Sequence, residues 1–265
     1  MLEIRDISKT FGKGTVNEHT ALNHVTLKVE NQDFITILGS NGAGKSTLFG
    51  AIVGSFLVDS GSILLDGDDI TYLPEFRRAR RLGILFQDPM KGTAPDLTIE
   101  ENLSLAYNQE RRFPLSKAVQ KSDLALFREE LASFGMGLED RMKMKVGLLS
   151  GGQRQAMTLL MATIAKPQLL LLDEHTAALD PATAEKVMGI TVKIVEERHI
   201  PTMMITHNMN MALKTGNRTL MLDNGEIILD IDARQREGMG VEQLMSLYSG
   251  KKGKTMDNDR MLLSV

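Results

Sequence analysis

The sequence contains no cysteine in its 265 residues. This absence excludes disulfides, thiolate metal sites and cysteine nucleophiles. No stretch approaches the roughly 20 apolar residues that a membrane-spanning helix needs, and the opening residues lack the basic-then-apolar layout of a signal peptide. The formal charge of -3, from 31 basic and 34 acidic side chains, supplies no basic field for nucleic acid. We therefore expect a cytoplasmic, non-spanning protein that does not bind DNA or RNA.

Short apolar runs alternate with helix-like patterns along most of the chain. The hydrophobic content of 42% and the charged content of 25% are those of an ordinary soluble globular protein. Residues 34–38 form an apolar run that stops abruptly at glycine, which predicts a central, buried parallel strand. Asn224 and Gly225 predict a hairpin turn near the end of the chain. This alternation predicts an α/β fold with a mainly parallel sheet. The other buried strands are expected at 82–86, 169–172 and 202–205, and half-buried strands at 2–7 and 25–29. Helices are expected at 46–53, 99–107, 121–134, 153–164, 182–197 and 241–248, with Ser150 and Asp180 as N-caps.

The segment 88–145 differs from the rest, because it carries two helical patterns and no convincing buried strand. We predict a single domain over 1–250, with a flexible tail at 251–265. Within that domain we expect a core of 1–87 and 146–230, a helical subdomain of 88–145 and a C-terminal helix in 231–250. The basic run at 77–81 predicts a solvated helix face, with contact to lipid headgroups as the alternative.

A glycine-rich turn follows the predicted central strand. Residues 39–46 read GSNGAGKS and fit the P-loop pattern G-x-x-x-x-G-K-[ST]. Glycines let backbone amides turn inward around phosphate oxygens, and the helix that follows adds its partial positive charge. In this pattern Lys45 reaches the β- and γ-phosphates and Ser46 ligates Mg²⁺. The predicted nucleotide-binding residues here are Gly39, Ser40, Asn41, Gly42, Ala43, Gly44, Lys45, Ser46 and Thr47.

Two acidic residues end the apolar run at 169–174, which reads LLLLDE. The carboxyl end of a central strand is where an α/β sheet presents groups to its ligand. Asp173 is expected to hold Mg²⁺ through water, and Glu174 to orient or deprotonate the attacking water. Taken alone, an acidic pair after a strand is more often a helix cap. Its occurrence together with a P-loop favours the catalytic interpretation.

The residues LSGGQ at 149–153 resemble the signature motif of the ATP-binding cassette (ABC) proteins, and they precede the acidic pair by about 20 residues, as in that family. The resemblance extends over about residues 1–230. Gln87 looks like the Q-loop glutamine, which in the family contacts Mg²⁺ and the attacking water, and residues 178–180 resemble the D-loop. His207 resembles the switch histidine that touches the γ-phosphate. Phe11 lies where the family stacks an aromatic ring on adenine, with core packing as the alternative.

The resemblance implies a P-loop NTPase of the ABC type, with a mainly parallel core sheet, an antiparallel β subdomain and an inserted α-helical subdomain. In this family two cassettes face each other head to tail and enclose ATP between them, and hydrolysis releases the dimer. Groups acting on the nucleotide in cis would be Lys45, Ser46, Gln87, Asp173, Glu174 and His207. Ser150, Gly151 and Gly152 would act in trans, and Gln153 and Asp180 complete the implied nucleotide contacts.

The function implied by this resemblance is that of the ATPase subunit of an ABC transporter, with ATP and Mg²⁺ as cofactors. Its partners would be a second ATPase copy, separate membrane permease subunits and, for import, an extracytoplasmic solute-binding protein. It would lie on the inner face of the cell membrane, with the permease contacting residues such as Met90 and Leu97. Import of amino acids or a similar small solute is the favoured interpretation. An exporter subunit and a soluble scaffold or remodelling ATPase are the alternatives.

One residue departs from the family pattern. The family usually has proline after the catalytic glutamate, whereas this chain has His175. An imidazole beside the general base would shift its pKa or add pH sensitivity. The favoured interpretation is that the ring faces the dimer interface or solvent.

Overall fold

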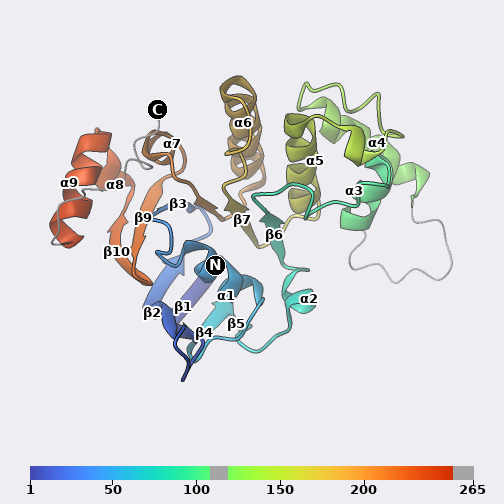
Figure 1. The fold of residues 1–265 in the computed structure, drawn as a ribbon. Helices are drawn as coiled ribbons and strands as arrows, with labels where there is room; N and C mark the ends of the chain where they lie inside the picture. The colour runs from blue at the N-terminus through green and yellow to red at the C-terminus, as the bar shows by residue number, and fades with distance from the viewer. Residues whose placement is uncertain (108–118, 253–265) are drawn as a thin grey trace. The chain divides into compact units, whose positions relative to one another are not determined.

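The computed structural model describes residues 1–107 and 119–252. It divides into two compact units, one made of Met1–Ala79 with Pro201–Val265 and the other of Arg80–Ile200 (Figure 1). Both are mixed α/β, as predicted. The division of the chain into a core and a helical subdomain at 88–145 stays a prediction. Among residues 1–107 and 119–252, no helix is both long enough and apolar enough to span a bilayer.

The first unit contains two sheets. In one, β1 pairs antiparallel with both β2 and β4, and β4 pairs with β5. In the other, β3 pairs in parallel with β8 and β9, and β9 forms an antiparallel hairpin with β10. The strands are β1 (Leu2–Phe11), β2 (His19–Val29), β3 (Phe34–Leu38), β4 (Ser60–Leu65), β5 (Asp68–Asp69), β8 (Thr202–Ile205), β9 (Arg218–Asp223) and β10 (Glu226–Ile231). The helices are α1 (Lys45–Val53), α2 (Glu75–Arg78), α7 (Met209–Lys214), α8 (Ala233–Arg236) and α9 (Val241–Lys252).

The predicted central strand is confirmed. All five residues of β3 are buried, and both of its neighbours in the sheet run parallel to it. A strand covered on both faces needs a continuous apolar run. The residues of β3, FITIL, are all apolar except Thr36. The Thr36 hydroxyl lies 2.9 Å from the Thr219 hydroxyl of β9, so this buried polar group is hydrogen-bonded. The hairpin turn is also confirmed, since Asn224 and Gly225 both have positive φ, 47° and 79°.

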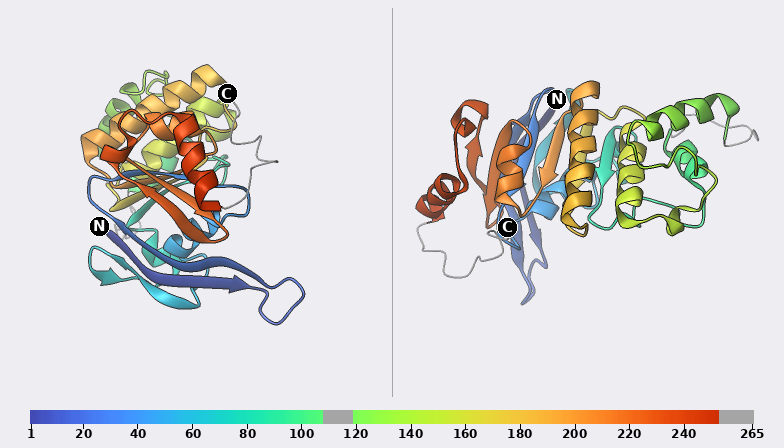
Figure 2. Two further views of the ribbon diagram at one scale, coloured as in Figure 1. Left: turned by 90° about the vertical axis from the view of Figure 1, so that its left-hand side faces the viewer. Right: turned by 90° about the horizontal axis from the view of Figure 1, so that it is seen from above.

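The second unit combines one parallel strand pair with a group of helices. β6 (Leu82–Leu85) pairs in parallel with β7 (Leu169–Asp173). The helices α3 (Ile99–Tyr107), α4 (Lys121–Ala132) and α5 (Gly151–Thr163) lie together, as Figure 2 shows from above. α6 (Pro181–Arg198) packs against α5, and a short 3-10 helix spans Val146–Leu148. The predicted absence of a buried strand from 88–145 holds for the described part of that segment, where only an isolated bridge, Thr98 with Lys145, occurs.

The predicted C-terminal helix is present as α9, and the range 231–250 also holds the short separate helix α8, which was not predicted. Asp232 begins α8 as its N-cap, accepting hydrogen bonds from the N–H groups of Arg234 and Gln235, both at 2.9 Å. Gly238 then takes a positive φ of 72°, which breaks the helical path before α9. The helix α9 continues to Lys252, so the predicted tail at 251–265 begins too early, and its residues 253–265 lie outside the described residues.

The basic run at 77–81 is not a uniformly solvated helix face. Arg78 is only 1% exposed. Its guanidinium donates to four backbone carbonyls, those of Ala51 (2.7 Å), Ile52 (3.0 Å), Thr71 (2.8 Å) and Leu73 (2.8 Å). Burial lowers the pKa of Arg78, although an arginine side chain stays charged at neutral pH. Arg78 therefore fixes the C-terminal end of α1, the helix that follows the glycine-rich turn.

Candidate functional site

At two positions of the turn between β3 and α1, the backbone conformation and the close neighbouring atoms allow only glycine. Gly39 and Gly44 have φ of 150° and 100°. A Cβ at Gly39 would lie 2.4 Å from the carbonyl oxygen of Leu222, and one at Gly44 would lie 2.6 Å from that of Ala21. The Gly225 N–H donates to the carbonyl of Ala43 at 3.0 Å, so the β9–β10 hairpin supports the turn. The predicted order of strand, glycine-rich turn and helix is confirmed.

Lys45, the first residue of α1, points back over this turn. Its side chain is 6% exposed, and its ammonium donates to the carbonyls of Gly39 (2.7 Å) and Ser40 (3.0 Å). Asn41, Gly42 and Ser46 are exposed, and Thr47 is half-buried. A buried cation beside exposed backbone at a helix N-terminus is suited to an anionic group such as phosphate.

His207 lies at the same edge of the sheet as this turn. It follows β8, which pairs with β3 so that Ile205 lies opposite Ile37. The Thr206 N–H donates to the carbonyl of Ile37 at 3.1 Å, and Asn208 caps α7 through the Met211 N–H at 2.9 Å. His207 is half-buried between these two fixed points. The structure therefore brings His207 and the glycine-rich turn to the carboxyl ends of adjacent parallel strands.

Phe11 is neither a core residue nor an isolated ring. It is 39% exposed and meets Phe56 edge to face, with ring centroids 5.1 Å apart. The Lys9 ammonium lies 5.4 Å from the Phe11 ring centroid and 5.5 Å from that of Phe56. Phe56 in turn packs on Gly50 of α1, where a Cβ would lie 2.8 Å from the ring. The core-packing alternative for Phe11 is wrong, because the residue remains partly exposed to solvent.

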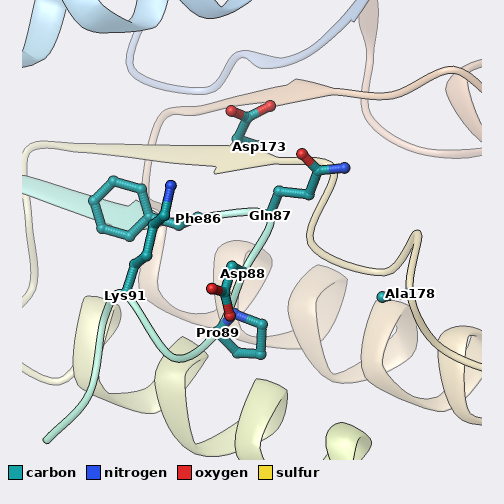
Figure 3. A pocket seen from close by; sticks show the side chains of 7 residues that line it. All are labelled: Phe86, Gln87, Asp88, Pro89, Lys91, Asp173 and Ala178. Atoms are coloured by element: carbon teal, nitrogen blue, oxygen red, sulfur yellow. The ribbon is translucent and has the colours of Figure 1, made fainter.

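In the second unit, polar side chains gather at the carboxyl ends of β6 and β7. A cavity of about 390 Å³ opens there, with the Gln87 amide and the Asp173 carboxylate on its wall (Figure 3). The Gln87 side-chain amide donates to the Glu174 carboxylate at 3.4 Å. The cavity is lined by Phe86, Gln87, Asp88, Pro89, Lys91, Asp173 and Ala178. The structure thus brings together three of the predicted residues, Gln87, Asp173 and Glu174.

Glu174 has an unusual backbone conformation. Its φ is 45°, in the left-handed region that disfavours residues with a Cβ. Its carbonyl accepts a hydrogen bond from the Ala177 N–H at 3.0 Å, which closes a turn directly after β7. Strained residues of this kind concentrate at functional sites.

Neither interpretation of His175 made from the sequence is right. The side chain is 3% exposed, and its Nε2 lies 3.1 Å from the hydroxyl oxygen of Thr191 on α6. Burial lowers the pKa of His175 to about 4, so the imidazole is neutral near pH 7 and adds no charge beside Glu174. The ring therefore neither faces solvent nor responds to physiological changes in pH.

The signature-like residues begin α5. The Ser150 hydroxyl accepts from the Gln153 N–H, and the Gln153 side chain accepts from the Ser150 N–H, both at 3.3 Å, which makes a capping box. Ser150 and Gly151 are exposed. Gly152 is buried, and a Cβ there would lie 2.2 Å from Thr183 of α6. Ser150 was expected as an N-cap, and this is confirmed, whereas the structural role of Gln153 was missed although its position three residues after a serine indicates it.

Asp180 begins α6. Its carboxylate accepts from the Thr183 N–H at 3.1 Å, and Pro181 occupies the first helical position. The hydrogen bonds from Thr183 lower the pKa of Asp180. This side chain therefore has a structural role as an N-cap, and its predicted contact with nucleotide stays a prediction.

A glycine-rich turn with a buried lysine between a parallel strand and a helix, together with an acidic pair at the end of another strand, defines a P-loop nucleotide-binding protein. Residues 22–177 match the family model described as ABC transporter. The chain belongs to the ABC transporter family, and it is an ATP-binding subunit that hydrolyses ATP.

Similar proteins are known from sequence and from structure. The chain is 41% identical over 248 residues to a tyrosine transport ATP-binding protein of Clostridioides difficile, covering 94% of this chain and 98% of that one. It is 34% identical over 230 residues to a methionine import ATP-binding protein of Corynebacterium efficiens, covering 86% of this chain and 61% of that one. A solved ATP-binding cassette in a dimeric, post-hydrolysis state with ADP and Pi matches with a TM-score of 0.74 at 29% identity, over 88% of this chain and 99% of that one.

Proposed function

We propose that the protein powers the import of an amino acid or a similar small solute through separate permease subunits. The observation that carries this proposal is the 41% identity to a tyrosine transport ATP-binding protein over 94% of this chain. The methionine import relative, at 34% identity, supports import as the direction of transport and an amino acid as the solute. We propose tyrosine or another aromatic amino acid as the first solute to test.

We also propose roles for the residues of the nucleotide site. Lys45 and the amides of the glycine-rich turn bind the β- and γ-phosphates, and His207 contacts the γ-phosphate. Glu174 accepts a proton from the attacking water, oriented by Gln87. What supports these roles is the buried cation at an exposed helix N-terminus and the cluster of oxygen donors at the ends of β6 and β7.

Magnesium is part of this proposal. Hydroxyl, amide and carboxylate oxygens are its ordinary ligands, and Mg²⁺ usually binds through one or two carboxylates together with substrate phosphates. Ser46, Gln87 and Asp173 offer these three donor types, and Asp173 and Gln87 line one cavity. In the part of the chain that the structure describes, no group of three or more His, Cys, Asp or Glu could hold a metal ion. When bound, Mg²⁺ neutralises charge on the transferring phosphate.

A second copy of the chain completes the proposed site. We propose that Ser150, Gly151 and Gly152 act on the nucleotide of the opposite copy. The exposed N-terminus of α5 supports this, because its partial positive charge is available to an anion. The dimeric cassette with ADP and Pi shows that a relative of the same fold assembles in pairs.

Adenine binding gives a prediction for Phe11. Because Phe11 contacts Phe56 and Lys9 and is still 39% exposed, we propose that its ring stacks on adenine. Phe11→Ala is expected to raise the Kd for ATP about 5- to 150-fold, since stacking of a base on an aromatic ring contributes roughly 1–3 kcal/mol. Equilibrium titration with a fluorescent ATP analogue measures this. Leu57→Ala, at an exposed position nearby in the same unit, is the control; equal effects of the two variants would contradict the stacking role.

The transporter assembly gives a second prediction. We propose that the protein is cytoplasmic, that it lies on the inner face of the membrane, and that Met90 and Leu97 contact a permease. Affinity capture from gently solubilised membranes with ATP present is expected to recover a multi-span protein in stoichiometric amount, with an extracytoplasmic solute-binding protein. Met90→Glu should reduce that recovery at least fivefold.

The chain offers a matched control for this capture. Leu247 is an apolar side chain with similar exposure, 44% against 38% for Met90, and lies on α9. Leu247→Glu is expected to leave recovery unchanged. If only soluble proteins are captured while ATPase activity is intact, the import proposal is wrong and a soluble scaffold takes its place.

A further inference from the structure

The residue directly after the proposed base is anchored in the interior of the second unit. His175 is 3% exposed, and Thr191, which lies in the middle of α6, is fully buried. Their side chains meet at 3.1 Å, between the imidazole Nε2 and the threonine hydroxyl oxygen. A buried polar pair of this kind is specific in geometry, because without the Thr191 hydroxyl the buried imidazole Nε2 would lose this hydrogen bond.

The direction of this hydrogen bond follows from the next contact. The Thr191 hydroxyl donates its single proton to the carbonyl of Val187, at 2.9 Å, one turn earlier in α6. Its oxygen must therefore accept from His175, so the proton of the neutral imidazole is on Nε2. The chain of hydrogen bonds thus runs from His175 through Thr191 into the backbone of α6.

The segment that His175 anchors is short and strained. Glu174 has the left-handed φ of 45°, and its carbonyl is bound by the Ala177 N–H. Two residues further, the Thr176 carbonyl accepts from the Leu179 N–H at 3.2 Å, and Asp180 then begins α6. The direction of the Glu174 side chain depends on its backbone dihedrals, so a shift of the next peptide would move the carboxylate.

A proline at 175 could not make this contact. Its ring fixes φ of residue 175 but offers no hydrogen-bond donor. In this chain the anchor is a hydrogen bond across to α6.

We propose that His175 is a positioning residue for Glu174: its hydrogen bond to Thr191 holds the peptide that follows Glu174 and so aims the carboxylate at the attacking water. This inference rests on the proposed role of Glu174 as the base. It predicts that loss of the hydrogen bond lowers the rate of the chemical step and leaves ATP binding unchanged, because the phosphate-binding turn is not touched.

Thr191→Val tests this directly, since it removes the accepting oxygen and keeps a branched side chain of similar size. In steady-state assays of the purified full chain with ATP and Mg²⁺, kcat is expected to fall at least 10-fold, with the Kd for ATP within twofold of the parent. Thr191→Ser keeps the hydroxyl and is expected to stay within threefold of the parent kcat. His175→Phe keeps an aromatic ring, removes Nε2 and should match Thr191→Val; it decides the question if Thr191→Val does not fold.

The outcomes separate this inference from the proposed function. If Glu174→Gln is inactive while folded Thr191→Val and His175→Phe keep the parent kcat, the positioning role is wrong and the role of Glu174 stands. If Glu174→Gln hydrolyses ATP normally, the proposed base itself is wrong. If the double variant Glu174→Gln, Thr191→Val is no slower than Glu174→Gln alone, the hydrogen bond acts through Glu174, as inferred. An additional 10-fold loss in the double variant would overturn that route.

Discussion

Glu174→Gln is expected to lower kcat for ATP hydrolysis by about 10²–10⁴-fold, the range that a positioned general base contributes. The amide keeps the size of the side chain and can still contact Gln87, 3.4 Å away. It cannot accept a proton from water. Because Lys45 and the glycine-rich turn are unchanged, ATP binding is expected within about threefold of the parent value.

Glu174→Gln is also expected to change the oligomeric state of the protein in the presence of ATP. If ATP closes a dimer and its hydrolysis opens it, a variant that binds but does not hydrolyse should accumulate as dimer. Size-exclusion chromatography with light scattering, with and without ATP, measures this. Glu185→Gln is the matched control, since Glu185 is an exposed acidic residue on α6 of the same unit. Normal hydrolysis by Glu174→Gln would remove Glu174 from the proposed mechanism.

The elements that carry the chemistry could be predicted from sequence because their signals are local. The glycine-rich turn, the acidic end of β7, and Ser150 and Asp180 as N-caps depend on residues within a few positions of each other. The bounds predicted for β3, β8 and α3 match the structure residue for residue. Periodic apolar residues and caps are enough to place such segments.

Two of the errors concern polar side chains that form hydrogen bonds with residues distant in sequence. His175 binds Thr191, 16 residues later, and Arg78 binds Ala51 and Ile52, 27 and 26 residues earlier. A polar residue with no visible local partner is most simply placed in solvent. The residues next to His175 or Arg78 in the sequence do not indicate that either side chain has a buried hydrogen-bond acceptor. The burial of these two side chains therefore follows only from the packed fold. The strand β4 was not predicted, since it carries glycine and serine.

Arg78→Leu is expected to lower the free energy of unfolding by roughly 3–5 kcal/mol, because four carbonyls lose their donor and an intramolecular hydrogen bond contributes about 1 kcal/mol net. Two of those carbonyls, at Ala51 and Ile52, belong to the last turn of α1, where no helical N–H is available. Gly54 ends this helix with φ of 88°, and a Cβ there would lie 2.7 Å from the Arg78 Nε. The leucine can fill much of the space but cannot bind the carbonyls.

Urea denaturation at a fixed pH measures this loss, and the neighbouring arginine of the same helix supplies the control. Arg77 is exposed, so Arg77→Leu is expected to change stability by no more than about 0.5 kcal/mol. Arg78→Lys should lie between the two, because an ammonium keeps the charge but cannot reach four carbonyls with the fork of a guanidinium. Equal stabilities for Arg78→Leu and Arg77→Leu would show that the carbonyls at the end of α1 find other donors. A large, selective loss at Arg78 would establish that a buried cation holds the far end of the helix whose first residue is Lys45.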